Sequence, residues 1–382
     1  MSASPDYEPI EINAFFRSHT HLPLWEILDK AGFWKQVGIK VNFEFCDSSS
    51  EAEAALFSGK IDLISGNHIS PYALVAQGKP IVSLASPTNG VTDRLVSREP
   101  IASLAEIRGK RVIDTTILDS GGGYNHIRGN HMLYILEAGL ELGDVHWVEI
   151  TDKMSGEFRA GQYEAMKAGE GDVTFVTGDT QRYEKAGFSV LQLPRLPMIN
   201  GPTLTTTISA LNKYDRFGER LVLAQVLGIH YGRTRKEETE KILEGLKKRE
   251  PEARNISYNS VAKLAAKPYP DHQAVANAYR LCCMKAPVAK EISPLAMWDL
   301  HFLRQLDNWN SSTSSTTADD HTSGTGDGQS RRTNPNFFPL DGGRLRWGCE
   351  SKIKITPSSV LPRRRLCRNK ATEGNEHEAI PL

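Results

Sequence analysis

A glycine-rich segment near the middle of the chain carries residues well suited to chemistry. Residues 120–128 include three consecutive glycines, and His126 and Arg128 follow them. A histidine can act as an acid or a base near neutral pH, and an arginine can hold a carboxylate through two parallel hydrogen bonds. Because glycine lets the backbone approach a ligand closely, the segment is predicted to contact a substrate, with a hinge or lid loop as the alternative. The expected substrate-binding residues are Ser120, Gly121, Gly122 and Arg128, and the catalytic candidate is His126.

A second catalytic candidate, His68, follows a short apolar run at residues 61–64. Asn67 precedes it and is a candidate for substrate binding. Such a run is typical of a buried strand, and in open α/β sheets ligands bind beyond the carboxyl ends of the strands. The alternative is a polar turn in which Asn67 is chosen for its tolerance of a left-handed backbone.

Three more candidates, His19, Thr20 and His21, separate a strand-like run at 10–16 from a helical pattern at 21–31. A helix that begins here would offer free backbone N–H groups to a carboxylate, phosphate or sulfonate. In the alternative, Thr20 caps the helix and the histidines lie on the surface. The remaining substrate-binding candidates, which follow the runs at 81–85 and 173–176, are Thr88, Asn89 and Thr177.

The composition limits the classes of partner. The chain has 382 residues with 46 basic and 46 acidic side chains, so it lacks the basic face that bulk nucleic-acid binding needs. No apolar run approaches the roughly 18 residues of a membrane span. No cluster of His, Cys and carboxylates has metal-ligand spacing, so no metal or other cofactor is expected. No secretory signal is readable, and five cysteines without regular spacing suit a reducing compartment, which predicts a cytoplasmic protein.

Apolar runs and helical patterns alternate along residues 9–305. The clearest unit spans residues 61–85, where an apolar run, a polar loop, a helical run at 70–77 and a second apolar run follow one another. Strand, helix and strand in this order form the unit of a parallel sheet. The predicted fold class is therefore α/β.

Two stretches, near residues 97–101 and 197–202, could join separate lobes. The chain would then cross twice, with lobe one formed by residues 9–97 plus 203–305 and lobe two by residues 98–202. Two crossings make a hinge, and the space between two lobes is a common ligand site.

The last part of the chain, residues 306–382, is predicted to be a disordered or non-native tail. Residues 310–330 are almost entirely Ser, Thr, Asp and Gly, which cannot bury enough apolar surface to offset the entropy of ordering. Contact of the basic residues beyond it with RNA or a partner is the alternative.

Several motifs together resemble the type II periplasmic-binding-protein fold, in its nitrate, sulfonate and thiamine-pyrimidine branch. Their order and spacing imply a two-lobed α/β fold with two crossings between the lobes, although such a fold hosts many functions. The family's extracellular members carry export signals, and the lack of a readable one here favours an intracellular relative. The matching segments are HLPLW (21–25), AGFW (31–34), VGIK (37–40), FSGKID (57–62), SLAEIRGKRV (103–112) and AGEGD (168–172).

Two groups of intracellular enzymes share this resemblance. The first group, the fungal thiamine-pyrimidine synthases, matches poorly. Gly66 stands where that family has its cofactor-binding lysine, and Ser70 stands where it has its substrate histidine. The family's cysteine-rich iron motif is also missing. HIRG at 126–129, AGL at 138–140 and VHW at 145–147 resemble the dihydroxyphthalate decarboxylases instead. The resemblance implies a decarboxylase that needs no cofactor.

The expected function is thus that of an intracellular enzyme acting on a small hydroxylated aromatic or other carboxylated metabolite in a biosynthetic or catabolic step. His126 or His68 would protonate the carbanion-like carbon. The alternative is a non-catalytic binding protein for a small anion or heterocycle, related to the substrate-binding subunits of ABC transporters. The expected partner is a small carboxylate or aromatic ligand, without nucleic acid or membrane, and the sequence leaves the oligomeric state open.

Overall fold

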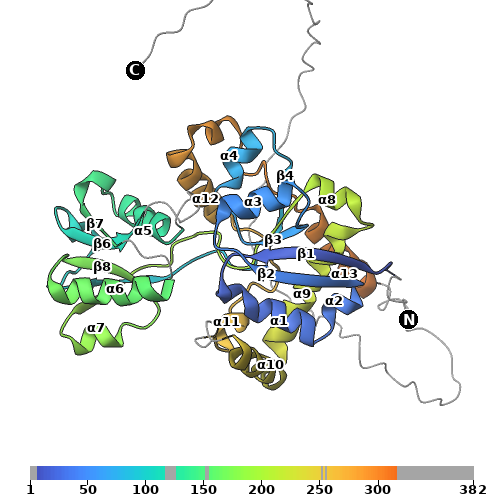
Figure 1. Cartoon of the computed structure of the whole chain (residues 1–382), viewed down its shortest axis with the longest axis horizontal. Coiled ribbons are helices and arrows are strands. Elements are labelled where there is room, and N and C mark those ends of the chain that lie inside the picture. Colours follow the sequence, from blue (N-terminus) through green and yellow to red (C-terminus); the bar gives the residue numbers. More distant parts are fainter. Residues whose placement is uncertain (1–6, 117–125, 151–154, 251–252, 254–255, 316–382) are drawn as a thin grey trace, which may run out of the picture. The chain divides into compact units, whose positions relative to one another are not determined.

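The structure of this chain, a computed structural model, describes residues 7–116, 126–150, 155–250, 253 and 256–315. Within these residues the strands form two five-stranded sheets, each accompanied by helices (Figure 1). Both sheets contain parallel and antiparallel neighbours. The predicted two-lobed α/β class is confirmed.

The first sheet is built from β1 (Ile10–Phe16), β2 (Ile39–Phe45), β3 (Leu63–Ser65), β4 (Ile81–Ala85) and β10 (Leu204–Thr207). Its strand order is β2-β1-β3-β10-β4. β1 runs parallel to β2 and β3, whereas β10 runs antiparallel to β3 and β4. The unit predicted at residues 61–85 therefore exists, but its two strands are not direct neighbours, because a strand from much later in the chain lies between them.

Strand β10 is buried along its whole length. Its β-branched threonines suit a strand, and their hydroxyls find partners inside the sheet. Thr205 Oγ1 donates to the Gly66 carbonyl at 2.9 Å, and Thr206 Oγ1 donates to the Asp62 carbonyl at 2.7 Å. These side-chain bonds add to the backbone ladder and hold both ends of β3 in place.

The second sheet is built from β5 (Asp93–Ser97), β6 (Arg111–Thr115), β7 (His146–Ile150), β8 (Val173–Thr177) and β9 (Ser189–Gln192). Its order is β7-β6-β8-β5-β9. β6 is parallel to β7 and β8, and β5 is antiparallel to β8 and β9. All of its strands thus come from one continuous stretch of the chain.

The chain crosses between the sheets twice, once between β4 and β5 and once between β9 and β10. The two connections pair with each other through the antiparallel bridges Thr88–Asn200 and Val91–Leu196. The first crossing lies before β5, and β5 pairs in the second sheet. The prediction that lobe one extends to residue 97 is therefore wrong for β5. The rest of the predicted division into residues 9–97 plus 203–305 and 98–202 stays a prediction.

Helices account for most of the remaining described residues, and none of these helices is long and apolar enough to cross a membrane. The predicted tail begins too early, because Leu306 is buried in a helix and Asp307 lies 2.9 Å from Lys267 Nζ. The main helices are α1 (Leu22–Lys30), α2 (Phe33–Gln36), α3 (Ser49–Phe57), α4 (Pro71–Ala76), α5 (His126–Glu137), α6 (Ser155–Ala168), α7 (Gln181–Lys185), α8 (Ile208–Lys213), α9 (Phe217–Thr234), α10 (Lys236–Arg249), α11 (Asn259–Ala262), α12 (His272–Lys285) and α13 (His301–Ser315).

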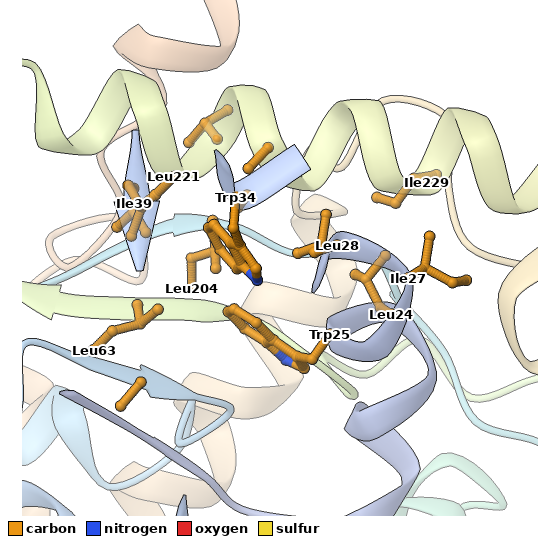
Figure 2. Packing of buried hydrophobic residues seen from close by; sticks show 14 of the residues in the cluster. Leu24, Trp25, Ile27, Leu28, Trp34, Ile39, Leu63, Leu204, Leu221 and Ile229 are labelled. Atoms are coloured by element: carbon orange, nitrogen blue, oxygen red, sulfur yellow. The ribbon is translucent and has the colours of Figure 1, made fainter. Parts of the chain in front are cut away.

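The main core of the first sheet lies between the sheet and helices α1 and α9 (Figure 2). Trp25 of α1 stacks on Trp34 of α2, with ring centroids 5.2 Å apart. Leu28 of α1 packs toward Gly228 of α9, where the lack of a side chain lets the two helices approach closely. The position of α1 matters for the site because its N-terminal end carries His21.

This close approach can be tested with Gly228→Ala. The new Cβ would lie 2.2 Å from Leu28 Cδ2, so we expect a loss of about 1–3 kcal/mol in the free energy of unfolding. Gly245→Ala in α10 is the matched control, because its Cβ would meet nothing closer than Arg249 Nη1 at 3.7 Å. The control should be neutral or should stabilise the protein by up to about 1 kcal/mol. Equal effects of the two variants in urea unfolding would contradict the packing described here.

Candidate functional site

Two of the predicted residues, His68 and His126, meet in the structure. His68 lies in the loop after β3, and His126 is the first residue of α5 beside the second sheet. Their ring centroids are 4.9 Å apart with an interplanar angle of 78°, an edge-to-face contact. Segments that belong to different sheets thus bring both catalytic candidates together.

Both rings carry a buried nitrogen without a hydrogen-bond partner among the described residues. These atoms are Nδ1 of His68 and Nε2 of His126, and the side-chain oxygen of Asn130 is in the same state. A buried polar atom left without a partner costs about 1–3 kcal/mol, so each one calls for an explanation, and a bound ligand is one that fits a pair of facing rings. Single buried atoms in the same state occur elsewhere in the described residues, for example at Gln225 and Thr239. His126 and Asn130 stand four residues apart on α5, a spacing that places them on one face of the helix.

Both histidines are neutral at pH 7. Burial lowers the pKa of His68 well below its usual value, and repulsion from His126 and His21 in their protonated forms and from Arg17 adds to the effect. Burial also lowers the pKa of His126 to about 4, with a smaller contribution from His131. A neutral imidazole presents one donor and one acceptor nitrogen, so each ring can bind either kind of ligand atom.

His21, a predicted ligand contact, is buried and bonded within the protein. Its Nδ1 lies 3.1 Å from the Ser65 carbonyl and 3.2 Å from Ser65 Oγ, which also accepts a bond from Trp25 Nε1 at 2.9 Å. Burial lowers the pKa of His21 to about 3. We find that His21 fixes the carboxyl end of β3, from which the loop to His68 starts.

The two residues before it lie nearer the surface. Thr20 is exposed and does not cap α1, whose N-cap residue is His21; its backbone N–H donates to Ser18 Oγ in a short turn that precedes the helix. His19 packs on Phe45, with ring centroids 4.4 Å apart. The contacts that the structure describes for His19 and Thr20 are thus with Phe16, Phe45 and Ser18.

Asn67 adopts the left-handed backbone conformation, with φ of 61°, which is the conformation that the turn interpretation requires. Its side chain is also engaged, because Nδ2 donates to Glu53 Oε1 at 2.9 Å. Ser70 Oγ donates to the same oxygen at 2.5 Å. The sequence analysis missed Glu53, a buried carboxylate of α3 that ties down both ends of the short loop containing His68.

Arg128 is buried, and the described contacts of its guanidinium are made within the protein. Nη1 donates to the Thr115 carbonyl at 3.0 Å, and the guanidinium lies 3.4 Å from the centre of the Trp147 ring. Asp114 and Glu149 lie at 3.9 and 3.7 Å. Its predicted bond to a ligand carboxylate stays a prediction.

The other residues predicted to contact a ligand lie near the crossings between the sheets or outside the residues that the structure describes. The Thr88 carbonyl accepts a bond from Asn200 N at 3.0 Å, and Asn89 Nδ2 donates to the Tyr269 carbonyl at 2.8 Å. Thr177 Oγ1 donates to Asp93 at 2.5 Å. Ser120, Gly121 and Gly122 lie outside the described residues. No group of His, Cys, Asp and Glu in the described part of the chain could hold a metal ion.

Comparison with known proteins agrees with this architecture. Residues 27–213 match the family model described as "NMT1/THI5 like". A putative sulfonate-binding protein SsuA from Methylobacillus flagellatus is 15% identical, with a TM-score of 0.55 over 84% of this chain and 99% of that one. This chain has the type II periplasmic-binding-protein fold. The resemblance inferred from the sequence motifs is thereby confirmed.

Other solved structures with this fold include a binding protein and an enzyme. The periplasmic aliphatic sulphonate-binding protein SsuA from Escherichia coli is 15% identical, with a TM-score of 0.54 over 76% of this chain and 96% of that one. The desulfurization enzyme DSZB is also 15% identical, with a TM-score of 0.50 over 78% and 99%. No curated protein matches this sequence significantly. At these identities the likeness shows the periplasmic-binding-protein fold and no activity.

The buried neutral histidines make stability depend on pH. The pKa of His21 is about 3 when folded and about 6.5 when unfolded, so the unfolded chain binds more protons between these values. The contribution of such a histidine to stability should be full above pH 6.5 and should be lost as the pH drops toward its folded pKa, at up to about 1.4 kcal/mol per pH unit.

His21→Asn tests this relation, because the amide can still bond Ser65 but does not titrate. Urea unfolding at pH 7.5 and 5 should give this variant a smaller loss of stability than the wild type. The exposed His146→Asn serves as the control and should keep the wild-type loss. An unchanged pH dependence in His21→Asn would show that His21 is not buried in its neutral form.

Proposed function

We propose that this chain is a binding protein for a small organic molecule, which contacts His68 and His126. The observation that carries the proposal is that two buried, neutral imidazoles meet at 4.9 Å and each keeps a nitrogen without a partner among the described residues. A ligand that bonds these atoms would recover the free energy that their burial costs. The cytoplasmic location expected from the sequence stays a prediction.

The surroundings of His68 favour an anionic ligand. Arg17 follows β1, and its positive charge helps to lower the pKa of both His21 and His68. The same field that disfavours a protonated histidine attracts a negative ligand group. Two proteins with this fold are described as sulfonate-binding, and DSZB is described in complex with biphenyl-2-sulfinic acid. Organic sulfonates, sulfinates and carboxylates are therefore the first probes, and neutral heterocycles form the comparison set.

Binding can be measured by thermal shift and calorimetry with these probes. A ligand at about 100 times its Kd should stabilise the wild type by about 2.7 kcal/mol. His68→Ala, His126→Ala and Asn130→Ala should each weaken binding by about tenfold, because each removes a hydrogen bond to the ligand worth about 1–1.5 kcal/mol. His146→Ala, an exposed histidine of β7, should leave the affinity unchanged.

The same variants can disprove the proposal. The unfolding free energies of His68→Ala and His126→Ala without ligand should stay close to that of the wild type. If no anion or heterocycle binds the wild type, or if binding survives in both alanine variants, these histidines do not form the ligand site.

Catalysis by the same pair is the second candidate function. The observation that favours it is the lowered pKa of both rings, which suits a general base. It does not suit the proton donation that a decarboxylase step would ask of His126, because a group with a pKa of about 4 is only about 0.1% protonated at pH 7. We therefore place a decarboxylase below a binding protein.

The two functions differ in the fate of the ligand. Each probe that binds is incubated with the protein and followed by NMR and mass spectrometry. The binding function predicts recovery of the unchanged probe, whereas turnover that is lost in His126→Ala with binding retained would establish an enzyme. Loss of carbon dioxide from a carboxylate probe would support the decarboxylase in particular.

A further inference from the structure

Four charged side chains meet where α5 packs on the second sheet. Asp93 begins β5, Asp114 lies in β6, and Arg128 and His131 belong to α5. Each is at most 4% exposed. We call these four residues the α5 charge network. The proposed binding site makes no direct use of them, yet buried charges persist only when they are paired.

His131 lies at the centre of the network. Its Nδ1 is 2.8 Å from Asp114 Oδ2, and its Nε2 is 3.9 Å from Asp93 Oδ2. Its ring stacks on Phe175 of β8, with centroids 4.5 Å apart and an interplanar angle of 11°. The imidazole is therefore fixed in position and orientation by three strands of the second sheet.

The carboxylates are themselves held in place. Asp114 Oδ1 accepts a bond from the Thr115 backbone N–H at 2.7 Å, and Asp93 Oδ1 accepts from Thr177 Oγ1 at 2.5 Å. Their second oxygens thus point to His131. Two anchored carboxylates on opposite sides of one ring leave little freedom for the helix that carries it.

Arg128 makes the second attachment of α5, three residues before His131. It donates to the Thr115 carbonyl at 3.0 Å and lies 3.9 Å from Asp114 Oδ2. Because residues three apart share a face of a helix, Arg128 and His131 hold the same face of α5 against β6. His126 stands two residues before Arg128, in the first turn of the same helix.

We propose that His131 and Arg128 are positioning residues, which fix the first turns of α5 through Asp114 and Asp93 and so hold His126 at its contact with His68. This proposal rests on the proposed binding function, since it assigns the network to the geometry of that site. It also has a consequence for the apo protein, because the attachment of α5 does not need a ligand.

The attachment requires a positive charge on His131. Burial alone would lower the pKa of His131, but the hydrogen-bonded carboxylate of Asp114 and the charge of Asp93 raise it above the usual value, against an opposing contribution from Arg128. Phe175, the neighbour from β8, carries no charge. Deprotonation of His131 at alkaline pH would leave two buried carboxylates with Arg128 as their nearest cation.

The pH dependence of binding therefore has two separate causes. Below a pH of about 4, His126 becomes a cation with two donor nitrogens, which changes the ligand contact itself. At alkaline pH, His131 loses its proton and α5 loosens, although His68 and His126 are already neutral there. The weakening of binding on the alkaline side would therefore belong to a residue outside the ligand contact.

Ethanesulfonate is the probe for the binding arm, because its charge does not change with pH. We expect its Kd to rise by about tenfold in the wild type as the pH passes the pKa of His131. His131→Gln should bind it about tenfold more weakly at every pH, and its Kd should not rise further at alkaline pH. In the double variant Asp114→Asn/His131→Gln, a neutral pair of amides should restore the affinity without restoring the pH dependence. His146→Gln should keep the wild-type profile. An alkaline side that persists in His131→Gln would overturn the proposal.

Two measurements on the wild type without ligand test the network independently of binding. NMR of the imidazole nitrogens should show His131 doubly protonated at pH 7, and a neutral His131 would overturn the proposal even if the variants fail to fold. Hydrogen exchange of the α5 amides, corrected for intrinsic rates, should accelerate about tenfold across the same alkaline transition. Unchanged protection would overturn the proposal. If ethanesulfonate and the other probes fail to bind while these two results hold, the binding function fails and the attachment of α5 stands.

Discussion

The geometry of the first sheet depends on the insertion of β10 between β3 and β4. This strand supplies hydrogen bonds to both neighbours, and its Thr205 hydroxyl holds the Gly66 carbonyl at the start of the loop to His68. His21 fixes the same end of β3 through Ser65. The position of His68 is thus set from several elements at once, and His126 meets it from a helix that is attached to the other sheet. The structure therefore offers a ligand one histidine held beside each sheet, and no hydrogen bond between the two rings is described.

The alternation of apolar runs and helical patterns was enough to predict most elements and the fold class. The sequence could not predict which sheet a strand would join. β5 has the pattern of any short buried strand, and its neighbours β8 and β9 lie far along the chain. Strand pairing of this kind is decided by long-range packing and leaves no local signal. For the same reason the arrival of β10 between β3 and β4 was not foreseen.

The candidate site was predicted in part. The rule that ligands lie beyond the carboxyl ends of strands pointed to His68, and the glycine-rich segment pointed to His126. Glu53, Asn130 and His131 were missed because each lies inside a helix, where a polar residue reads as part of a solvated face. The one available signal was the spacing of His126 and Asn130, four residues apart on α5. The predicted bond of Arg128 to a ligand carboxylate stays a prediction, and its contacts inside the protein depend on the register of β6 and could not be read from the chain.

The order of the strands along the chain has a consequence for biosynthesis. Every strand of the second sheet lies between β4 and β10, so that sheet can complete its pairing while the first still lacks its fourth strand in the spatial order. Until β10 leaves the ribosome, β3 and β4 each expose an unpaired edge, and such edges favour association between chains. A nascent chain that stalls before residue 204 would therefore carry one sheet with all its strands and one sheet with unpaired edges at β3 and β4, so association between chains is favoured until β10 is inserted.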